Sequence, residues 1–422
     1  MIKAFTSSLI GMLVDEGLLS FSTQLQGIFP EFQRQDAQAN ITIEDLMSHR
    51  TGLAPMDNLW FSSYNDILVD RNQAIPIMSY APVAGPFRSS FNYNNIAYEI
   101  LGQVLEKVTG LSYADLLRQR IIELLKLNRT FYAGETMDDN TAKSYAALAN
   151  GLSHELRPSV KDLLSLYKAL MEAANSQAWT AAITNPFKQV PELFGGKVGV
   201  GSTSLREYSY ASGYIMGNAG IVALFLETST GIVVLGNSIL VETTFENDFN
   251  ATTYTRFARE ARDYFVQYVH DRNEELLANK TALAPINPLN AYVGKYYNSI
   301  NSVFVEIKLN GDKLQVAFLG VDIDTYELHP YQNDSFFWTL SFDESAKRAR
   351  LPWFPAEYFI LKFGCRSEPS WWQFGKEVDM GCLTWKHEFT VSGDGEAFRK
   401  EHRGHGPSGV NNAVGSQQPA DL

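Results

Sequence analysis

The side chains that could do chemistry in this sequence are few, and their spacing argues against several kinds of active site. Seven histidines are scattered along 422 residues without an H-E-x-x-H or similar spacing, so no metal site is predicted. The sequence contains neither a phosphate-binding G-x4-G-K-S/T loop nor the G-x-S-x-G turn of the usual Ser-His-Asp hydrolases. His402 and His405 belong to a polar tail and are expected to be solvated. We therefore predict no metal and no cofactor.

One group of side chains remains, formed by Lys3 near the amino terminus and by Tyr93 and Asn95 directly ahead of an expected helix. Each also has an ordinary structural interpretation. Lys3 could be solvated at a frayed terminus, Tyr93 could pack against the core, and Asn95 could cap the helix that follows. His49 is interpreted as a structural hydrogen-bonding residue rather than a base, and Asp162 as a carboxylate in the first turn of a helix.

The chain opens with the residues MIKAFTSSLIGMLVDEG, whose apolar positions recur at helical spacing and predict a helix that ends near Gly17. Its apolar side is formed by Phe5, Leu9, Met12 and Leu13. A signal peptide is the rival interpretation, because Lys3 could be its charged region. Polar residues at 6–8 interrupt its apolar core, and acidic residues at 15–16 follow without a cleavage site, so the helix is favoured.

Composition limits the partners that this chain can have. A net charge of −12 argues against a nucleic-acid or anionic membrane surface, and no apolar run is long enough to span a bilayer. The only cysteines are Cys365 and Cys382, too few for a disulfide framework and without zinc spacing. A reducing compartment, and hence a cytoplasmic location, fits this usage best, while a single bridge between the two stays open. Composition assigns no oligomeric state.

The elements expected in the first two-thirds of the chain are mostly helices with a few strands. Thr42 and Asp45 have the spacing of a capping box that opens a short helix. A strong helical period runs over residues 95–108. Two β-branched runs joined at residues 227–231 predict a strand, a tight turn and a second strand, and a long helix is expected over about residues 253–277.

The composition changes after a proline-containing linker at residues 278–290. Short alternating strands then predict a β-barrel-like domain over residues 291–400, with a hairpin turn at Asn310-Gly311. The aromatic residues at 336–338 are interpreted as core. Residues 401–422 are rich in Gly, His, Pro and Gln, which predicts a disordered tail.

Three segments, in this order, resemble the serine β-lactamase and penicillin-binding-protein superfamily: ITIEDLMSHRTGLAPMDNLW, FNYNNIAYEILGQVLEKVTGLSYADLL and ETSTGIVVLGNS. The sequence is most similar to the fungal branch related to class C β-lactamases, esterases and acyltransferases. The resemblance spans about residues 1–270. It implies an α/β (α+β) β-lactamase/transpeptidase-like fold over residues 1–277, with a central antiparallel sheet and a helical subdomain. The domain after the linker resembles the lipocalin-like β-domain often appended to such proteins.

In that superfamily the nucleophile is the serine of a Ser-x-x-Lys motif at the start of a helix. The spacing puts both side chains on one helix face, where a buried lysine with a lowered pKa can take the serine proton. By resemblance, Lys3 is the motif lysine, Tyr93 relays a proton to the leaving group, and Asn95 fixes substrate and lysine. The serine would fall one residue before Met1, so either the true start lies upstream or the nucleophile has been lost.

Other serines fit the motif poorly. The string Ser165-x-x-Lys168 occurs in a different segment, and about one such match is expected by chance in a chain of this length. Ser7 and Ser8 lie about a turn beyond Lys3 and would need a rebuilt site.

The third motif of the superfamily is altered. The stretch YSYASGYIMGN aligns with a Tyr-His-Ser-Gly pattern, which places Ala211 where histidine or lysine is usual, followed by Ser212 and Gly213. The resemblance implies an oxyanion hole that uses the backbone N–H of Tyr214, which survives the change. The basic side chain that helps bind a substrate carboxylate or tune the tyrosine does not survive.

Two hypotheses follow. The first is a serine hydrolase or acyltransferase that acts through an acyl-enzyme on a small ester, amide or thioester-borne acyl group, with secondary metabolism as one setting. The second is a catalytically inactive pseudoenzyme or binding protein that keeps the fold, favoured by Ala211 and by the missing serine. Under the first hypothesis the partner is a small-molecule acyl substrate, and nucleic acid and membrane are excluded under both.

Overall fold

The computed structural model describes residues 3–127, 144–156, 209–236, 251–366 and 378–401, apart from gaps at 61–62, 64–66, 151–152, 216–217, 226–229, 282–283 and 391–392. Within these ranges, the side chains of strands β1–β5 and of a few residues at the ends of other elements are also left undescribed. Several residues singled out from the sequence lie outside the described residues: Asp162, Ser165, Lys168, His402 and His405.

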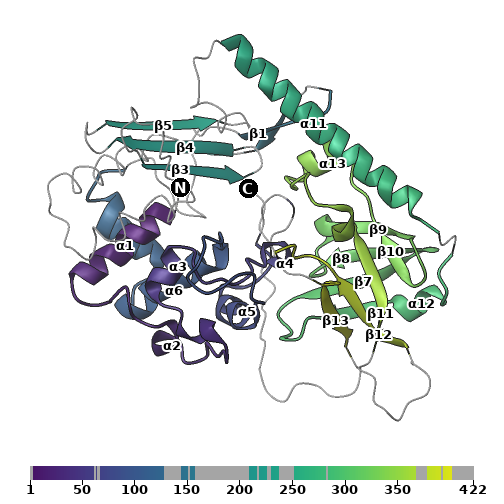
Figure 1. The fold of residues 1–422 in the computed structure, drawn as a ribbon, viewed down its shortest axis with the longest axis horizontal. Coiled ribbons are helices and arrows are strands. Elements are labelled where there is room, and N and C mark those ends of the chain that lie inside the picture. The colour runs from purple at the N-terminus through teal and green to yellow at the C-terminus, as the bar shows by residue number, and fades with distance from the viewer. Residues whose placement is uncertain are drawn as a thin grey trace, which may run out of the picture.

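The amino-terminal part of the described chain is a cluster of helices (Figure 1). Its α-helices are Lys3–Asp15 (α1), Leu25–Ile28 (α2), Ile43–Met47 (α3), Asp57–Trp60 (α4), Ala74–Tyr80 (α5), Asn95–Thr109 (α6) and Tyr113–Leu117 (α7). Shorter turns lie at Ala37–Asn40 (η1), Arg71–Gln73 (η3) and Arg118–Ile122 (η4). The apolar faces of α1 and α6 pack against each other and form the centre of the core.

The local signals in the sequence account for where these helices begin and end. Thr42 and Asp45 form the predicted capping box of α3. The side chain of Asn94 caps α6, and Gly110 ends it in a left-handed conformation with φ of +72°. The predicted opening helix is confirmed as α1, and Gly17 follows it with φ of +73°. These signals fix the two helices that carry the candidate site.

The second element of the architecture is an antiparallel sheet formed by Ser209–Ile215 (β3), Asn218–Phe225 (β4) and Thr230–Gly236 (β5), in the order β3-β4-β5. Strands β4 and β5 confirm the strand, turn and strand predicted around residues 227–231. A separate hairpin pairs Ser144–Ala147 (β1) with Ser153–Leu156 (β2). In the view of Figure 1 the sheet lies above the helices, with β3 on the side of α1.

The long predicted helix is present as Ala251–Ala278 (α11) and leads from the sheet to the carboxy-terminal part, along whose edge it runs (Figure 1). Its side chains bond to the carboxy-terminal part: Arg272 donates to the Leu340 carbonyl at 3.0 Å, and the Tyr268 hydroxyl donates to the Trp353 carbonyl at 3.1 Å. Among the described residues, no helix is both long enough and apolar enough to cross a membrane.

The carboxy-terminal part is a closed eight-stranded antiparallel barrel. Its strands are Gly294–Tyr297 (β6), Phe304–Asn310 (β7), Lys313–Phe318 (β8), Thr325–Pro330 (β9), Ser335–Phe337 (β10), Ile360–Arg366 (β11), Val378–Trp385 (β12) and Glu396–Lys400 (β13). Each strand pairs with its neighbours in sequence, and β13 returns to β6. The hairpin predicted at Asn310-Gly311 joins β7 to β8, and the aromatic residues at 336–338 are core, each about 1% exposed. Short helices lie at Leu289–Tyr292 (α12), Asp322–Asp324 (η7), Phe342–Lys347 (α13) and Ala356–Phe359 (η8).

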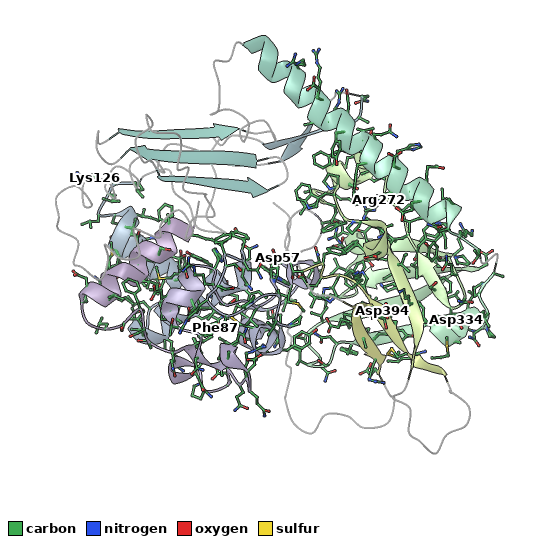
Figure 2. All side chains as sticks on the ribbon, viewed as in Figure 1. Asp57, Phe87, Lys126, Arg272, Asp334 and Asp394 are labelled. Carbon is green, nitrogen blue, oxygen red and sulfur yellow. A yellow bond between two sulfur atoms is a disulfide. The ribbon has the colours of Figure 1, made fainter. Side chains whose placement is uncertain are left out.

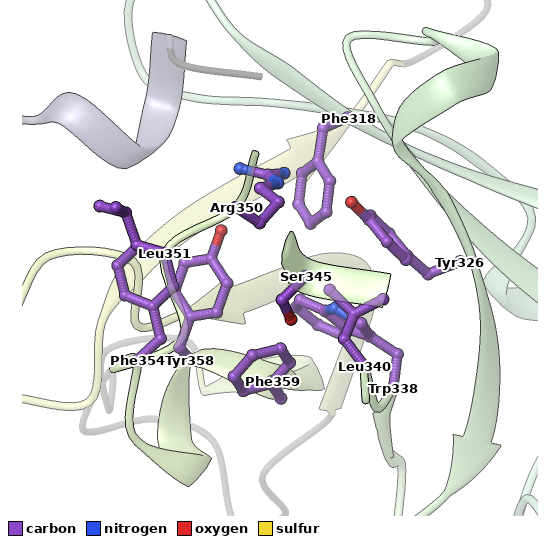
Figure 3. Close-up of a pocket in the computed structure, with 10 residues that line it drawn as sticks. All are labelled: Phe318, Tyr326, Trp338, Leu340, Ser345, Arg350, Leu351, Phe354, Tyr358 and Phe359. Carbon is purple, nitrogen blue, oxygen red and sulfur yellow. The ribbon is translucent and has the colours of Figure 1, made fainter. Parts of the chain in front are cut away.

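A buried ion pair between two connecting segments of the carboxy-terminal part also joins this part to the helices. Asp324 is fully buried, and the Arg350 guanidinium donates to one of its oxygens at 3.0 Å. Tyr326 donates to the same oxygen at 2.8 Å, and Ser63 of the helical part donates its backbone N–H and its hydroxyl at 3.0 and 2.7 Å. Figure 3 shows the hydroxyls of Tyr326 and Tyr358 turned toward Arg350 across a small aromatic pocket.

The two cysteines are brought together by neighbouring strands of the barrel. Cys365 on β11 and Cys382 on β12 are joined by a disulfide, with their Cα atoms 5.4 Å apart. The bridge that the sequence left open is therefore present. Such bridges are more typical of oxidising than of reducing compartments, so cysteine usage does not support the reducing compartment favoured from the sequence.

Candidate active site

Lys3 lies at the start of α1, where this helix packs on α6. Its Nζ atom donates to the side-chain oxygen of Asn95 at 2.8 Å. The same atom lies 4.7 Å from the centre of the Tyr93 ring and 5.1 Å from the centre of the Tyr98 ring. The three residues grouped from the sequence, Lys3, Tyr93 and Asn95, are therefore brought together, although 90 positions separate the lysine from the tyrosine. Lys3 is not a solvated residue at a frayed terminus.

The interpretation of Asn95 as a helix cap is wrong, because its neighbour has that role. The side chain of Asn94 accepts a hydrogen bond from the Ala97 N–H and caps α6. Asn95 is the first residue of the helix, so its side chain is not needed for capping. Its amide instead joins two charged side chains, with the oxygen toward Lys3 and the nitrogen donating to Asp57 at 3.0 Å.

Burial sets the electrostatics of Lys3. Removal from water lowers the pKa of its ammonium group from 10.5 to about 8, against the opposing effect of the nearby Asp57 carboxylate. A lysine with this pKa is neutral in roughly a tenth of molecules at pH 7, whereas an exposed lysine is neutral in far fewer. Lys3 can therefore both accept and return a proton near neutral pH.

Tyr93 and His49 form an aromatic wall beside the lysine. Their ring centres are 4.8 Å apart, and Phe91 and Tyr98 lie against the same histidine at 5.2 and 5.1 Å. Burial, together with the negative charge of Asp57, raises the pKa of Tyr93 to about 12, so its phenol stays protonated near neutral pH. The side chain is nevertheless 44% exposed, which leaves it accessible to a bound molecule.

His49 is buried and neutral. Its Nδ1 atom accepts from the Asn94 backbone N–H at 3.1 Å, in line with the structural role expected from the sequence. Burial, aided by the positive charge of Lys3, lowers its pKa to about 3, so it is a poor proton acceptor at neutral pH. Its Nε2 atom is buried and has no hydrogen-bond partner among the described residues.

Sequence reasoning missed Asp57. This residue begins α4 and lies within the segment SHRTGLAPMDNLW, where a single carboxylate before a short helix reads as an ordinary first-turn residue. Burial raises its pKa to about 7, despite the hydrogen bond from Asn95 and the positive charge of Lys3, both of which lower it. The second carboxylate oxygen, Oδ1, is buried without a hydrogen-bond partner among the described residues.

The residues predicted for the oxyanion hole lie on β3. Ala211, Ser212, Gly213 and Tyr214 pair in register with Val222, Ile221, Gly220 and Ala219 of β4. Strand β3 has a described partner on one side only, which is the arrangement an edge strand needs if its backbone is to face a substrate. The side chains of this strand lie outside the described residues.

The hydroxyls of Ser7 and Ser8 make hydrogen bonds away from Lys3. The Tyr98 hydroxyl has one proton and donates it to the Met47 carbonyl at 3.0 Å, so Ser7, 3.1 Å away, must donate to Tyr98. Ser8 donates to the carbonyl of Ala4 in its own helix at 2.8 Å. Neither serine is hydrogen-bonded to Lys3, and neither has a base in place.

The arrangement combines a lysine that can exchange a proton with a tyrosine that stays protonated and an amide that holds the lysine in place. These are the groups that a serine nucleophile at the start of α1 would need for acyl transfer. In the part of the chain that the structure describes, no three His, Cys, Asp or Glu side chains gather in a way that could hold a metal ion.

Comparison with known proteins gives a family match over more than half of the chain. Residues 1–251 match the family model described as Beta-lactamase. Teichoic acid D-alanine hydrolase of Staphylococcus aureus is 27% identical over 210 residues, covering 46% of this chain and 50% of that protein. Unguisins hydrolase ungD' of Aspergillus campestris is 26% identical over 140 residues, and penicillin-binding protein 4 of Amycolatopsis lactamdurans is 30% identical over 130 residues.

These matches cover only part of the relatives. The alignments with the Aspergillus and Amycolatopsis proteins span 32% and 30% of this chain, and 26% and 33% of the respective relatives. The chain thus spans between about a quarter and a half of the length of the curated relatives named here.

Solved structures were found at low similarity. A penicillin-binding protein from Bacillus halodurans is 22% identical with a TM-score of 0.44, covering 61% of this chain and 83% of that chain. The octameric penicillin-binding protein homologue from Pyrococcus abyssi is 19% identical with a TM-score of 0.45, covering 81% of both chains.

Proposed function

The chain belongs to the beta-lactamase family. We propose that it acts as a serine hydrolase in which Lys3 is the general base of acyl-enzyme formation. The observation that carries this proposal is the contact of Lys3 with Asn95 and Tyr93, because it joins two motifs of the family at the start of α1. The family match over residues 1–251 supports a β-lactamase/transpeptidase-like fold for this part of the chain.

The proposed reaction begins with the neutral form of Lys3. Its amine takes the proton of a serine hydroxyl one helical turn earlier, and the serine oxygen attacks the carbonyl carbon of the substrate. The negative charge that develops on the substrate oxygen is stabilised by backbone N–H groups, including that of Tyr214 on β3. Tyr93 passes a proton to the leaving group as its bond to the carbonyl carbon breaks, and water then releases the acyl group from the serine.

The proposed substrate class is a small ester or amide. The relatives are a hydrolase of unguisins, a penicillin-binding protein and a hydrolase of D-alanine on teichoic acid, and a common mechanism would give this chain the same kind of bond to cleave. Transfer of the acyl group to an acceptor other than water, as in an acyltransferase, belongs to the same proposal because it uses the same acyl-enzyme. Of the relatives named here, the unguisins hydrolase is from an Aspergillus, which supports the proposed fungal origin, and a role in secondary metabolism remains part of the proposal.

Ala211 favours a second function. Without a basic side chain at that position, the site loses a group that helps bind substrate or tune the tyrosine, and a non-catalytic binding protein would tolerate this loss. Such a protein would still recognise a small acyl-bearing molecule through the exposed aromatic side chains of Tyr93 and Phe91, which are 44% and 36% exposed. The two functions differ in whether a covalent acyl group is ever formed.

The experiment that separates the two functions uses the protein as it occurs in its source organism. The codon directly ahead of Met1 is read first, and the purified protein is then treated with a fluorophosphonate probe and with a panel of p-nitrophenyl esters. A serine codon, one probe molecule per chain and ester turnover would support the hydrolase. A different codon together with reversible ligand binding and no adduct would support the binding protein.

We propose that the barrel is lipocalin-like, because its eight strands are antiparallel neighbours that close on themselves in an up-and-down order.

We also keep the cytoplasmic location as a proposal, and the redox state of the two cysteines tests it directly. Alkylation of both Cys365 and Cys382 in cells lysed directly into denaturant, which exposes the buried Cys382, would support a reducing compartment, whereas protection of both would overturn it.

A further inference from the structure

The barrel holds the loop that carries Asp57. On one side of this residue, the Met56 backbone N–H donates to the Glu388 carboxylate at 3.1 Å. On the other side, the Asn58 side chain donates to the His387 carbonyl at 2.6 Å. Both acceptors belong to the connection between β12 and β13, more than 300 residues further along the chain. Figure 2 shows Asp57 where the helical part meets the barrel.

Held in this way, Asp57 presents its carboxylate to the candidate site. Its Oδ2 atom accepts from the Asn95 amide at 3.0 Å, while Oδ1 is buried without a hydrogen-bond partner among the described residues. A buried carboxylate with a single donor destabilises a fold, because the hydrogen bonds it made with water are not replaced. Such an arrangement calls for a functional reason.

Hydrogen-bond chemistry gives that reason. The ionised Asp57 carboxylate can only accept hydrogen bonds, so in this form the amide nitrogen of Asn95 must face Asp57. The amide oxygen then points the other way, toward the Lys3 ammonium, which can only donate. If Asp57 were replaced by a group that also donates, the amide could turn over and present its N–H groups to the lysine.

We infer that Asp57 is a positioning residue, which fixes the orientation of Asn95 and thereby the place of Lys3, and that the barrel loop at 387–388 holds Asp57 for this task. The inference rests on the proposed function, since Lys3 matters only if it is the base. It assigns the barrel a part in the chemistry, although none of the described barrel residues is in contact with Lys3.

The charges around Asp57 set the direction of each expected effect. The Asp57 carboxylate favours the charged form of Lys3 and so raises the lysine pKa, against the larger lowering by burial. Glu388 is a second negative charge near Asp57 and raises the pKa of that carboxyl. His49 is neutral at these pH values, and Tyr93 stays protonated, so neither adds a charge.

Two isosteric variants therefore move Lys3 in different directions. Asp57→Asn removes the negative charge and allows the Asn95 amide to turn over, and both changes lower the pKa of Lys3. Glu388→Gln keeps an acceptor for the Met56 N–H but removes the charge that opposes ionisation of Asp57. More of the Asp57 side chains are then ionised, and the pKa of Lys3 stays or rises.

The test is the titration of Lys3 by NMR in the full chain labelled with 13C and 15N in lysine. The signal is assigned by its loss in Lys3→Met. We expect the wild-type lysine to titrate near pH 8, Asp57→Asn to titrate lower by about half a unit or more, and Asp57→Glu to recover part of the shift. Backbone spectra of barrel residues show that each variant is folded.

Several outcomes would overturn the inference. One is an unchanged Lys3 titration in Asp57→Asn, and another is a downward shift of similar size in Glu388→Gln, which would indicate a general disturbance of the loop. If Asp57→Asn does not fold, the sign of the shift in Glu388→Gln decides. Failure of the proposed function looks different, because a wild-type Lys3 that titrates near 10.5 removes the base whatever Asp57 does.

Discussion

Two buried carboxylates, one in the carboxy-terminal part and one at the candidate site, differ in how they are satisfied. Asp324 accepts hydrogen bonds from Ser63, Tyr326 and Arg350, and these donors outweigh the effect of burial, so its pKa lies below the ordinary value. Asp57 accepts from one amide, and burial raises its pKa to about 7. The first is a structural ion pair with its hydrogen bonds made. The second has a pKa near neutral pH, as titratable groups in functional sites often do.

The same contrast holds for the two neighbouring asparagines at the start of α6. Asn94 caps the helix and is 1% exposed, so its work is structural. Asn95 makes no cap and joins Lys3 to Asp57. The fold thus places a structural and a candidate functional side chain of the same type one residue apart, and substitutions should separate them.

The largest effect is expected from Lys3→Met. In a protein that carries the motif serine, loss of the base should lower the rate of ester hydrolysis by about a thousandfold or more. Folding should be unharmed, because methionine fills a similar volume without a buried charge. Lys107→Met at the end of α6 is the matched control. A variant of Lys3 that retained a tenth of the rate would remove it as the base.

Next in size is Arg350→Met, which breaks the buried ion pair of the carboxy-terminal part. Removal of the guanidinium takes the positive charge away from the buried Asp324 carboxylate, so the free energy of unfolding should fall by about 3–5 kcal/mol, measured by urea titration. Lys362→Met, which removes a surface ion pair with Asp394, should cost less than about 1 kcal/mol. Equal losses in the two variants would mean that the buried pair has no special role.

Asp57→Asn should raise the free energy of unfolding instead of lowering it. The folded-state pKa of Asp57 is raised from 3.8 to about 7, so the stability contributed by its protonated form is fully present below about pH 4 and is lost as the pH rises through 7. Asparagine does not ionise and loses nothing over this range.

At pH 8 we therefore expect the variant to be more stable than the wild type by about 2 kcal/mol. This is less than the roughly 4 kcal/mol that a net shift of about three pKa units represents, because the buried asparagine amide brings N–H groups that need acceptors of their own. The difference should vanish near pH 4. The exposed Asp394→Asn is the control and should show no such pH dependence, and a destabilised Asp57→Asn at pH 8 would contradict the account.

The smallest effect separates Asn94 from Asn95. Asn94→Ala should lower the free energy of unfolding by about 1 kcal/mol through loss of the helix cap. Asn95→Ala should cost less stability but change the titration of Lys3. Thermal unfolding and lysine NMR of both variants provide the comparison. Equal changes in stability and in the Lys3 titration for the two substitutions would contradict the separate roles of Asn94 and Asn95.

Much of the fold could be predicted because its signals are local. The cap at Thr42, the helical period after Asn95 and the turn at Asn310-Gly311 each depend on residues a few positions apart. The grouping of Lys3, Tyr93 and Asn95 could also be predicted, but only from the order of motifs in a known family.

The rest of the site could not be predicted, because it depends on contacts across the whole chain. Asp57 gains its role from Asn95, 38 positions away, and from Glu388, which approaches only once the barrel has closed. No local pattern marks either contact. The alternative interpretation of Asn95 as the helix cap was wrong, since Asn94 and Asn95 have the same intrinsic capping propensity and only the backbone geometry of the helix start distinguishes them.

In the proposed mechanism, Lys3 activates a serine placed one helical turn before it. The most direct test is mass spectrometry of the natural protein after treatment with a fluorophosphonate. We expect one adduct per chain, on the serine three residues ahead of Lys3, and we expect no adduct in Lys3→Met. An adduct on Ser7, Ser8 or Ser165, or no adduct on a protein that carries that serine, would contradict this mechanism.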